Sequence, residues 1–236
     1  MKAVILAAGR GVRLRPLTEK IPKVMVKVKG KPLLEHVLAR LAEAGIGGFE
    51  IVVGYRREEI EKHFGKSFAG VPVNYLFQAE QLGTAHAIAL ARGRVKGNFL
   101  VVNADVLVES ALFRELATID EFDDFDVKVV GRTVDDPWRY GVLVEEGGTL
   151  RDIVEKPNYG EEPGNLINAG IYRFNQKIFG AIGKTKKSAR GEFEIVDSIK
   201  ILMRAGGKVA VVHYAGACID IGDLDDLKKA NESELP

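Results

Sequence analysis

The hydrophobic pattern of the first hundred residues alternates between two kinds of segment. Short, continuous apolar runs predict β-strands over four ranges: Ala3–Ala8, Phe49–Val53, Val71–Phe77 and Phe99–Asn103. Helical patterns between the runs, ended by Gly45, Gly65 and Gly93, predict helices over three: Leu33–Ala44, Arg57–Phe64 and Thr84–Ala91. This alternation is typical of a parallel sheet with crossover helices. Because Phe99–Asn103 is apolar on both faces, it is predicted to lie centrally.

The second half of the chain has a different character. Five further strands are predicted, with turn residues between them: Val127–Arg132, Tyr140–Val144, Leu150–Glu155, Ala169–Phe174 and Lys208–Tyr214. Helices are expected near Ser110 and over Lys177–Ile182, Phe193–Ala205 and Leu224–Asn231. We therefore expect antiparallel additions to an α/β fold with a mixed, mostly parallel sheet and helices on both faces. No linker, repeat or low-complexity tract interrupts the chain, which predicts a single domain over residues 1–236.

Composition narrows the class of protein. A chain of 236 residues suits one α/β unit, and its net charge of +1 argues against a general nucleic-acid or membrane-surface role. The single cysteine, Cys218, allows neither an internal disulfide nor a cysteine zinc cluster. No apolar run approaches the roughly 20 residues that span a bilayer. The first apolar run is short and ends in glycine and arginine, unlike a signal peptide. We expect a soluble cytoplasmic protein.

A basic, glycine-bearing loop follows the first strand. Between Arg10 and Lys31 eight Lys and Arg residues stand against one acid. Exposed backbone amides and cations at a strand end are typical of a phosphate cradle, and the charge favours a polyanionic ligand. The dinucleotide fingerprint fails because Leu14 stands where its third glycine belongs. A P-loop at Gly65-Lys66-Ser67 fails because Ile60 replaces its upstream glycine.

The amino-terminal signature resembles that of the sugar-1-phosphate nucleotidyltransferases, also called nucleoside-diphosphate-sugar pyrophosphorylases. It reads Leu6-Ala7-Ala8-Gly9-x-Gly11-x-Arg13-Leu14-x-Pro16-Leu17-Thr18, then Pro22-Lys23, then Gly30-Lys31-Pro32-Leu33. The resemblance implies a Rossmann-like nucleotide-diphospho-sugar transferase fold of the GT-A type. It also implies a nucleoside triphosphate and a sugar 1-phosphate as substrates, Mg²⁺ as cofactor, and a chain that is open to homo-oligomerisation. No hexapeptide repeats follow, so we expect no β-helix acyltransferase domain.

Two aspartates are candidate metal ligands. Asp105 lies just past the strand Phe99–Asn103, and Asp220 follows the strand Lys208–Tyr214. Ligands of open α/β sheets bind outside the carboxyl ends of strands, and Mg²⁺ takes one or two carboxylates plus phosphates and waters. The resemblance assigns both positions to the metal. For Asp105 the alternative is a turn or helix-capping acid.

The segment Gln78–Ala85 resembles the base-reading part of the family. A glutamine amide can read the imide edge of uracil or thymine, and Gly83 would allow close backbone approach. This favours UTP or dTTP, the alternative being a polar strand-to-helix turn. The resemblance assigns nucleotide binding to the following residues: Leu6, Ala7, Ala8, Gly9, Gly11, Arg13, Lys23, Gln78, Gly83, Thr84 and Asp105.

Three later segments match the family's sugar site: Tyr140-Gly141, Glu155-Lys156-Pro157 and Asn168–Tyr172. The resemblance assigns sugar binding to Gly141, Glu155, Lys156 and Asn168, and the catalytic charges to Arg13, Lys23 and Lys156. The segment Gly191–Glu194 is similar to another family segment near the sugar pocket, but it is also typical of a plain helix start and is left out of the site.

Two residues depart from the family pattern. Cys218 replaces a usual tryptophan, which is expected to alter the wall of the sugar pocket. Asp223 replaces a usual threonine and can still cap the last helix.

Three other functions remain open. Asn103-Ala104-Asp105 resembles the metal motif of nucleotide-sugar-dependent glycosyltransferases, although the signature from Leu6 to Lys31 opposes that reading. A mannose-1-phosphate guanylyltransferase and a non-catalytic nucleotide-sugar-binding regulator are the others. In the implied reaction a phosphate oxygen attacks the α-phosphorus in line. Phosphate monoesters have a second pKa of about 6, so no general base is required.

Overall fold

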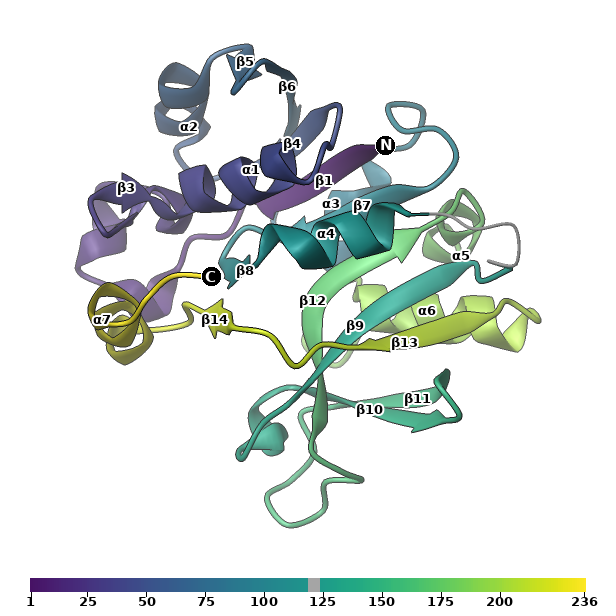
Figure 1. Cartoon of the computed structure of the whole chain (residues 1–236). Helices are drawn as coiled ribbons and strands as arrows, with labels where there is room; N and C mark the ends of the chain where they lie inside the picture. Colours follow the sequence, from purple (N-terminus) through teal and green to yellow (C-terminus); the bar gives the residue numbers. More distant parts are fainter. Residues whose placement is uncertain (119–123) are drawn as a thin grey trace.

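The computed structural model describes residues 1–118 and 124–236, built around one ten-stranded mixed sheet (Figure 1). The strand order is β10-β11-β13-β9-β12-β7-β1-β4-β6-β5. The bounds are β1 Lys2–Ala7, β4 Phe49–Val53, β5 Ser67–Phe68, β6 Val71–Phe77, β7 Phe99–Asn103, β9 Val127–Thr133, β10 Gly141–Glu146, β11 Thr149–Glu155, β12 Leu166–Phe174 and β13 Val209–His213.

One half of the sheet is parallel. β1 lies between β4 and β7, with β6 outside β4, and all three pairings run in the same direction. The predicted strands of this half are confirmed to within one residue, and β7 lies centrally as expected. Because parallel strands end at the same edge, the loops after β1, β4, β6 and β7 emerge together.

Alternation along these strands builds two apolar cores. Ile5 and Ile51 face a core with α1 (Leu33–Glu43), α2 (Arg57–Phe64) and α4 (Ser110–Ala117). Their neighbours Val4 and Val52 face a second core with α3 (Thr84–Ala89), α5 (Ile178–Ile182) and α6 (Ile195–Arg204). Successive strand side chains point to opposite faces, so an apolar run that fills both cores needs helices on each side. The expected two-sided α/β fold is confirmed.

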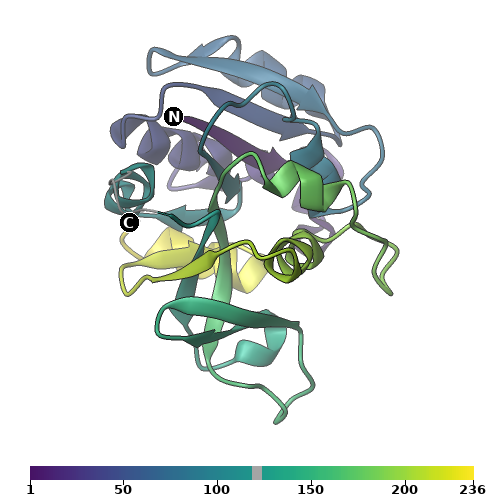
Figure 2. The same ribbon diagram turned by 90° about the vertical axis from the view of Figure 1, so that its right-hand side faces the viewer.

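The other half of the sheet carries the antiparallel additions. β12 runs antiparallel to both β7 and β9, and it also pairs with β10 through Val142 and Ile167. The ladder between β12 and β9 shifts register between Asn168 and Tyr172, where Gly170 has a φ of 72°. β10 and β11 form a hairpin that extends away from the parallel half in both views (Figures 1 and 2). β12 is therefore shared by the two halves.

Short elements missed by the hydrophobic pattern complete the fold. β8 (Val106–Val108) pairs antiparallel with β14 (Cys218–Asp220), and β2 (Lys27–Val28) pairs with β3 (Lys31–Pro32). Asp220 thus ends a strand of its own rather than the loop after β13. The predicted last helix is confirmed as α7 (Leu224–Glu232).

Five predicted helices differ from the observed ones by one or two residues at an end. α1 ends at Glu43 instead of Ala44, α6 at Arg204 instead of Ala205, and α7 at Glu232 instead of Asn231. α6 begins at Ile195 instead of Phe193, α3 ends at Ala89 instead of Ala91, and α5 begins at Ile178 instead of Lys177. Throughout the described ranges, every helix is too short or too polar to cross a bilayer.

Candidate active site

A cavity of about 430 Å³ lies where the carboxyl ends of the parallel strands meet the β10–β12 lobe, which is formed by β10, β11 and the first part of β12. Eight residues predicted from the sequence line it: Arg13, Thr84, Asp105, Gly141, Glu155, Lys156, Asn168 and Asp220. The wall holds four cationic side chains and six carboxylates. It is therefore a polar, charged site, rich in groups that bind phosphates, hydroxyls or metal ions.

The β8–β14 pair brings the two predicted metal ligands to one place. Asp220 lies opposite Val106 in the ladder, and the Ile221 amide donates to the Asp105 carbonyl at 3.0 Å. Burial raises the pKa of Asp220 to about 6, and the negative charge of Asp105 adds to the rise. Two residues 115 positions apart thus place carboxyl groups close enough to repel each other.

Lys23 binds one of these carboxylates directly. Its Nζ lies 2.5 Å from Asp105 Oδ2, and only 11% of the lysine side chain is exposed. Gly11 makes this possible, because it has a φ of 64° and a Cβ there would lie 2.6 Å from Lys23 Cβ. Thr18 Oγ1 donates to the Gly11 carbonyl at 2.7 Å and holds the loop closed. The basic loop therefore aims Lys23 at the predicted metal site.

Arg13 reaches the turn that follows Asp220. A Cβ added to Gly222 would lie 3.2 Å from Arg13 Nη1, which places the guanidinium against this turn. The Gly222 amide donates to Asp226 Oδ2 at 2.9 Å. Asp223 accepts from the amides of Asp225 and Asp226 and caps α7 as expected. The cap and the Gly222 contact fix the turn next to Arg13.

The predicted base-reading segment is held by internal bonds. Gln78 is 4% exposed, and its Nε2 lies 3.1 Å from the Gly83 carbonyl and 3.0 Å from His86 Nδ1. Gly83 has a φ of 105°, and a Cβ there would lie 2.5 Å from the Phe193 carbonyl. Thr84 Oγ1 accepts from the Ile195 amide at 2.9 Å. The segment is thereby clamped to the start of α6.

The β10–β11 hairpin and the residue after it carry three of the four predicted sugar residues, Gly141, Glu155 and Lys156. A Cβ on Gly141 would lie 2.8 Å from Glu155 Oε2, so the glycine leaves room for that carboxylate. Glu155 Oε1 lies 3.3 Å from Arg190 Nη2, which also contacts Glu194 at 2.9 Å. Lys156 has a φ of 45°, and its amide donates to the Tyr140 carbonyl.

Both polar atoms of the Asn168 side chain form hydrogen bonds within β12. Its Nδ2 donates to the Tyr172 hydroxyl at 2.7 Å, and its Oδ1 accepts from the Gly170 amide at 3.0 Å. A Cβ on Gly170 would lie 2.2 Å from Asn103 Nδ2. Asn168 therefore shapes the bulge of β12 as well as lining the cavity.

Not every predicted nucleotide residue lines the cavity. Those outside its wall are Leu6, Ala7, Ala8, Gly9, Gly11, Lys23, Gln78 and Gly83. Ala8 lies just past β1, where Gln81 Nε2 donates to its carbonyl at 2.6 Å.

Cys218 also lies outside the wall of the candidate active site. It lines a separate cavity of about 420 Å³ with Arg132 and His213. The expected effect of Cys218 on the wall of the sugar pocket stays a prediction.

Several lining residues were missed by the sequence analysis. Arg139, Arg190 and Asp226 are charged residues outside the matched motifs, and nothing in the local pattern distinguishes them. Glu192 and Glu194 belong to the segment that reads as a helix start, and both line the cavity next to Arg190.

Comparison with known proteins identifies the class. The sequence model of the Nucleotidyl transferase family matches residues 2–235. A UTP–glucose-1-phosphate uridylyltransferase, AglF from Haloferax volcanii, is 37% identical over 98% of this chain and 96% of its own length. The bifunctional protein GlmU of Methanococcus maripaludis is 38% identical over the whole chain. This chain spans 54% of the length of that relative.

Solved structures agree with the sequence relatives. A Bacillus anthracis structure assigned as a glucose-1-phosphate thymidylyltransferase aligns with a TM-score of 0.87 and 28% identity, covering 98% of this chain and 94% of its own. A UDP-glucose pyrophosphorylase in complex with UDP-glucose aligns with a TM-score of 0.83 and 25% identity, covering 98% and 97%. The chain belongs to the nucleotidyl transferase family. The resemblance to the sugar-1-phosphate nucleotidyltransferases is thereby confirmed, and the chain is an enzyme of that transferase class.

Proposed function

We propose that this enzyme joins UTP or dTTP to a hexose 1-phosphate, releasing pyrophosphate and a nucleotide sugar. The observation that carries the proposal is the convergence of Asp105, Asp220 and Arg13 with the sugar-site residues in one cavity, with Lys23 in contact with Asp105 from outside the cavity wall. The relatives described above are named for this kind of reaction.

The nucleophile needs no protein base. A sugar phosphate oxygen carries negative charge at neutral pH, since its second pKa is about 6. It attacks the α-phosphorus in line, and the bond to the pyrophosphate oxygen breaks with its electron pair leaving on pyrophosphate. The barrier is then the approach of two polyanions, so catalysis depends on positioning and charge.

Cationic side chains of the chain itself supply part of that charge. Arg13 approaches the cavity from the basic loop and would clamp the triphosphate. Lys156 and Arg190 enter from the sugar side and would hold the phosphate of the sugar. The two substrates would therefore meet between cations on opposite walls.

The carboxylates of the cavity fit a divalent cation. Six carboxylates outnumber the four cations of the wall, which would repel a triphosphate unless more positive charge entered with it. Asp105 and Asp220 would hold Mg²⁺, and when bound it would neutralise phosphate charge in the transition state. Across residues 1–118 and 124–236, no group of three His, Cys, Asp or Glu side chains forms a metal cluster. The remaining ligands would then be phosphate and water oxygens, which Mg²⁺ favours.

Gln78 supports the choice of UTP or dTTP. Its Nε2 is within hydrogen-bond distance of two internal partners, so its carbonyl oxygen is the part left for a base. An acceptor at this position suits the N3–H donor shared by uracil and thymine, and it disfavours cytosine and adenine, which present a ring acceptor there. Selection between these two bases would rest on other contacts.

A pyrophosphate-release assay over a panel of triphosphates and sugar phosphates tests the proposal. We expect release only when both substrates are present, with UTP or dTTP preferred. Preference for GTP with mannose 1-phosphate would support a guanylyltransferase instead. Binding of nucleotide sugar without any turnover would support a regulator, and sugar transfer without pyrophosphate release would support a glycosyltransferase.

Asp105→Asn gives the sharpest single variant. It removes a charge beside Lys23 and should lower kcat by about 1,000-fold, since one electrostatic stabiliser contributes 10²–10³. Asp225→Asn is the matched control, because Asp225 is an exposed residue of α7 outside the cavity. Equal activity of the two variants would contradict the proposed role of Asp105.

A further inference from the structure

A second charged concavity lies on the side of the sheet covered by α3, α5 and α6, between the α5–α6 connection and α6. It has a volume of about 390 Å³ and is lined by Lys184, Lys186, Lys187, Asp197, Lys200, Ile201 and Arg204. None of these residues lines the candidate active site. We propose that this concavity, together with the apolar cavity beside it, binds a phosphorylated small molecule.

The charge of this basic concavity differs from that of the active site. Five cations stand against one carboxylate here, whereas carboxylates outnumber cations in the catalytic cavity. The chain as a whole carries a net charge of only +1, so the cluster is a local excess. Like charges held together on a concave surface repel one another and raise the local potential for an anion. A phosphorylated ligand would relieve that repulsion.

Three of the cations are available to a ligand. Lys200 pairs with Asp152 at 2.8 Å, and Lys187 lies over the Phe193 ring at 5.7 Å from its centroid. Lys184, Lys186 and Arg204 are exposed. Within the described parts of the chain, the side-chain nitrogens of these three residues have no carboxylate oxygen within 4.0 Å. They come from two elements and flank the same concavity.

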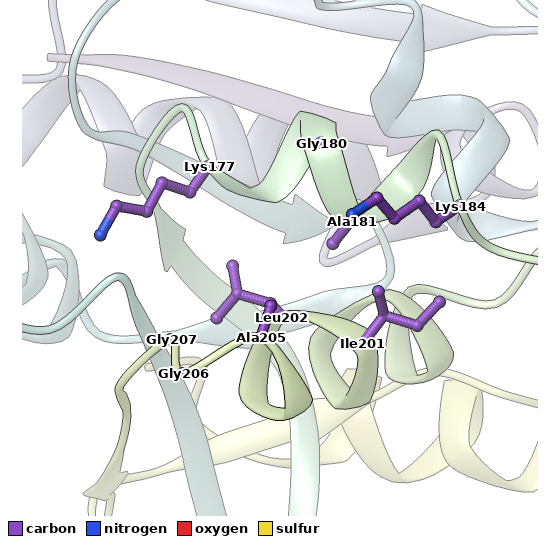
Figure 3. Close-up of a pocket in the computed structure, with 9 residues that line it drawn as sticks. All are labelled: Lys177, Gly180, Ala181, Lys184, Ile201, Leu202, Ala205, Gly206 and Gly207. Atoms are coloured by element: carbon purple, nitrogen blue, oxygen red, sulfur yellow. The ribbon is translucent and has the colours of Figure 1, made fainter.

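An apolar cavity of about 280 Å³ lies beside the basic one, between α5 and α6. It is lined by Lys177, Gly180, Ala181, Lys184, Ile201, Leu202, Ala205, Gly206 and Gly207. Figure 3 shows Ile201 and Leu202 pointing from α6 towards α5, with the two lysines on the α5 side. Lys184 and Ile201 line both cavities, so the two are immediate neighbours.

The two cavities together indicate the class of ligand. Lys177 is engaged with Asp126 at 2.8 Å, so the charge available at the apolar cavity is concentrated at its Lys184 side. A ligand with phosphates at one end and an apolar or planar body at the other matches this polarity. Nucleoside phosphates have that form, whereas inorganic pyrophosphate would fill the basic part alone. The cluster is confined to one concavity, unlike the extended basic stripe typical of nucleic-acid binding.

Titration calorimetry at low salt with ADP and with pyrophosphate tests the proposal. The Lys184→Gln/Lys186→Gln/Arg204→Gln variant should bind ADP at least tenfold more weakly than the wild type at this site. A control with Lys62, Lys66 and Lys228 changed to Gln removes three exposed lysines elsewhere and should bind normally. Pyrophosphate release in the absence of ADP should be unchanged in both variants, because none of the six residues lines the catalytic cavity.

Amide NMR shifts separate this site from the active site. ADP should perturb Gly180, Gly206 and Gly207 in the wild type and leave them unperturbed in the triple variant. Tighter binding of ADP than of pyrophosphate indicates a nucleoside phosphate, and equal binding indicates the phosphate groups alone. Perturbation confined to Asn103 and Gly170 in the catalytic cavity, or unchanged affinity in the triple variant, would overturn the proposal. So would tighter binding of a single-stranded oligonucleotide that the same triple variant abolishes.

Discussion

The two walls of the active-site cavity are built in different ways. On the parallel side, strand ends and the β8–β14 pair bring charged groups together, as the 2.5 Å contact between Lys23 and Asp105 shows. On the β10–β12 side, small residues create room, as Gly141 does for Glu155. We call the first the charged wall and the second, which also carries Lys156 and Arg190, the shaped wall. Changes in the first should therefore act mainly on kcat, and changes in the second on the KM of one substrate.

After Asp105→Asn, the largest loss of activity is expected from removing a cation of the charged wall. Arg13→Ala is expected to lower kcat by roughly several hundred-fold, because a phosphate-binding charge is lost in the transition state. Steady-state pyrophosphate release measures the loss. Arg15→Ala, an exposed residue of the same loop, serves as the control and should stay near wild type. Near-normal turnover of Arg13→Ala would show that this wall does not depend on the loop.

The charged wall should also make the metal-free protein sensitive to pH. The pKa of Asp220 rises from 3.8 to about 6 in the folded protein, so the folded state holds this proton more tightly than the unfolded state. The stability that this provides is complete below about pH 4 and is lost as pH rises to about 6. At 1.36 kcal/mol for each unit of pKa, the loss is about 3 kcal/mol at neutral pH.

Asp220→Asn should remove this dependence. In chelator, the variant should be more stable than wild type at pH 7.5 and should lose less stability between pH 4 and 6. Urea unfolding at several pH values measures both. Asp225→Asn should behave like wild type, since Asp225 is exposed. If Asp220→Asn and wild type show parallel profiles of stability against pH, the burial of Asp220 does not cause the loss of stability.

A change in the shaped wall should act on one substrate. In Gly141→Ala the new Cβ would come within 2.8 Å of Glu155 Oε2 and displace that carboxylate. We expect the KM for sugar phosphate to rise roughly tenfold while the KM for triphosphate stays constant, because a small misplacement of a contact weakens positioning. Gly164→Ala, with no atom within 4 Å of its Cβ, is the control. A parallel rise in both KM values would mean that the walls are not independent.

The smallest effect is expected at the edge of the charged wall. Asp223→Ala removes the side-chain cap of α7 and should lower stability by about 1 kcal/mol. In a chain of this length that corresponds to about 2–4 °C in Tm. Asp225→Ala changes the next charged residue without removing the cap. Thermal unfolding of the pair decides the matter, and an equal Tm for both variants would exclude a stabilising cap.

The strands of the parallel half could be predicted because their continuous apolar runs indicate burial on both faces of the sheet. β7 is apolar on both faces and lies under helices on both sides, so its pattern alone placed it centrally. β8 and β14 have three residues each and exist because Cys218 meets Val108 across a separation of 110 positions. No local pattern carries that pairing, although it is what brings Asp220 to Asp105.

Site residues that belong to sequence motifs could be predicted, whereas residues that reach the site only through tertiary contacts were missed. Asp105 and Lys23 stand in recognisable segments, and the structure brings them into contact. Arg139 and Arg190 enter the cavity from loops whose course depends on the whole fold. Gln78 shows the opposite case. Its residue type predicted a base contact, but its orientation is set by Gly83 and His86, which a sequence does not reveal.

The bulge at Gly170 has a consequence for how such an enzyme can change its substrate. Upstream of it, β12 pairs with β10 and β9 in the lobe that holds Gly141 and Glu155. Downstream, the same strand is paired with β7 beneath the triphosphate wall. A bend within one continuous ribbon lets the lobe be lengthened, shortened or re-angled while the downstream segment stays anchored. Acceptance of a different sugar can thus be acquired by remodelling one end of a strand, with the machinery for activating the nucleotide left intact.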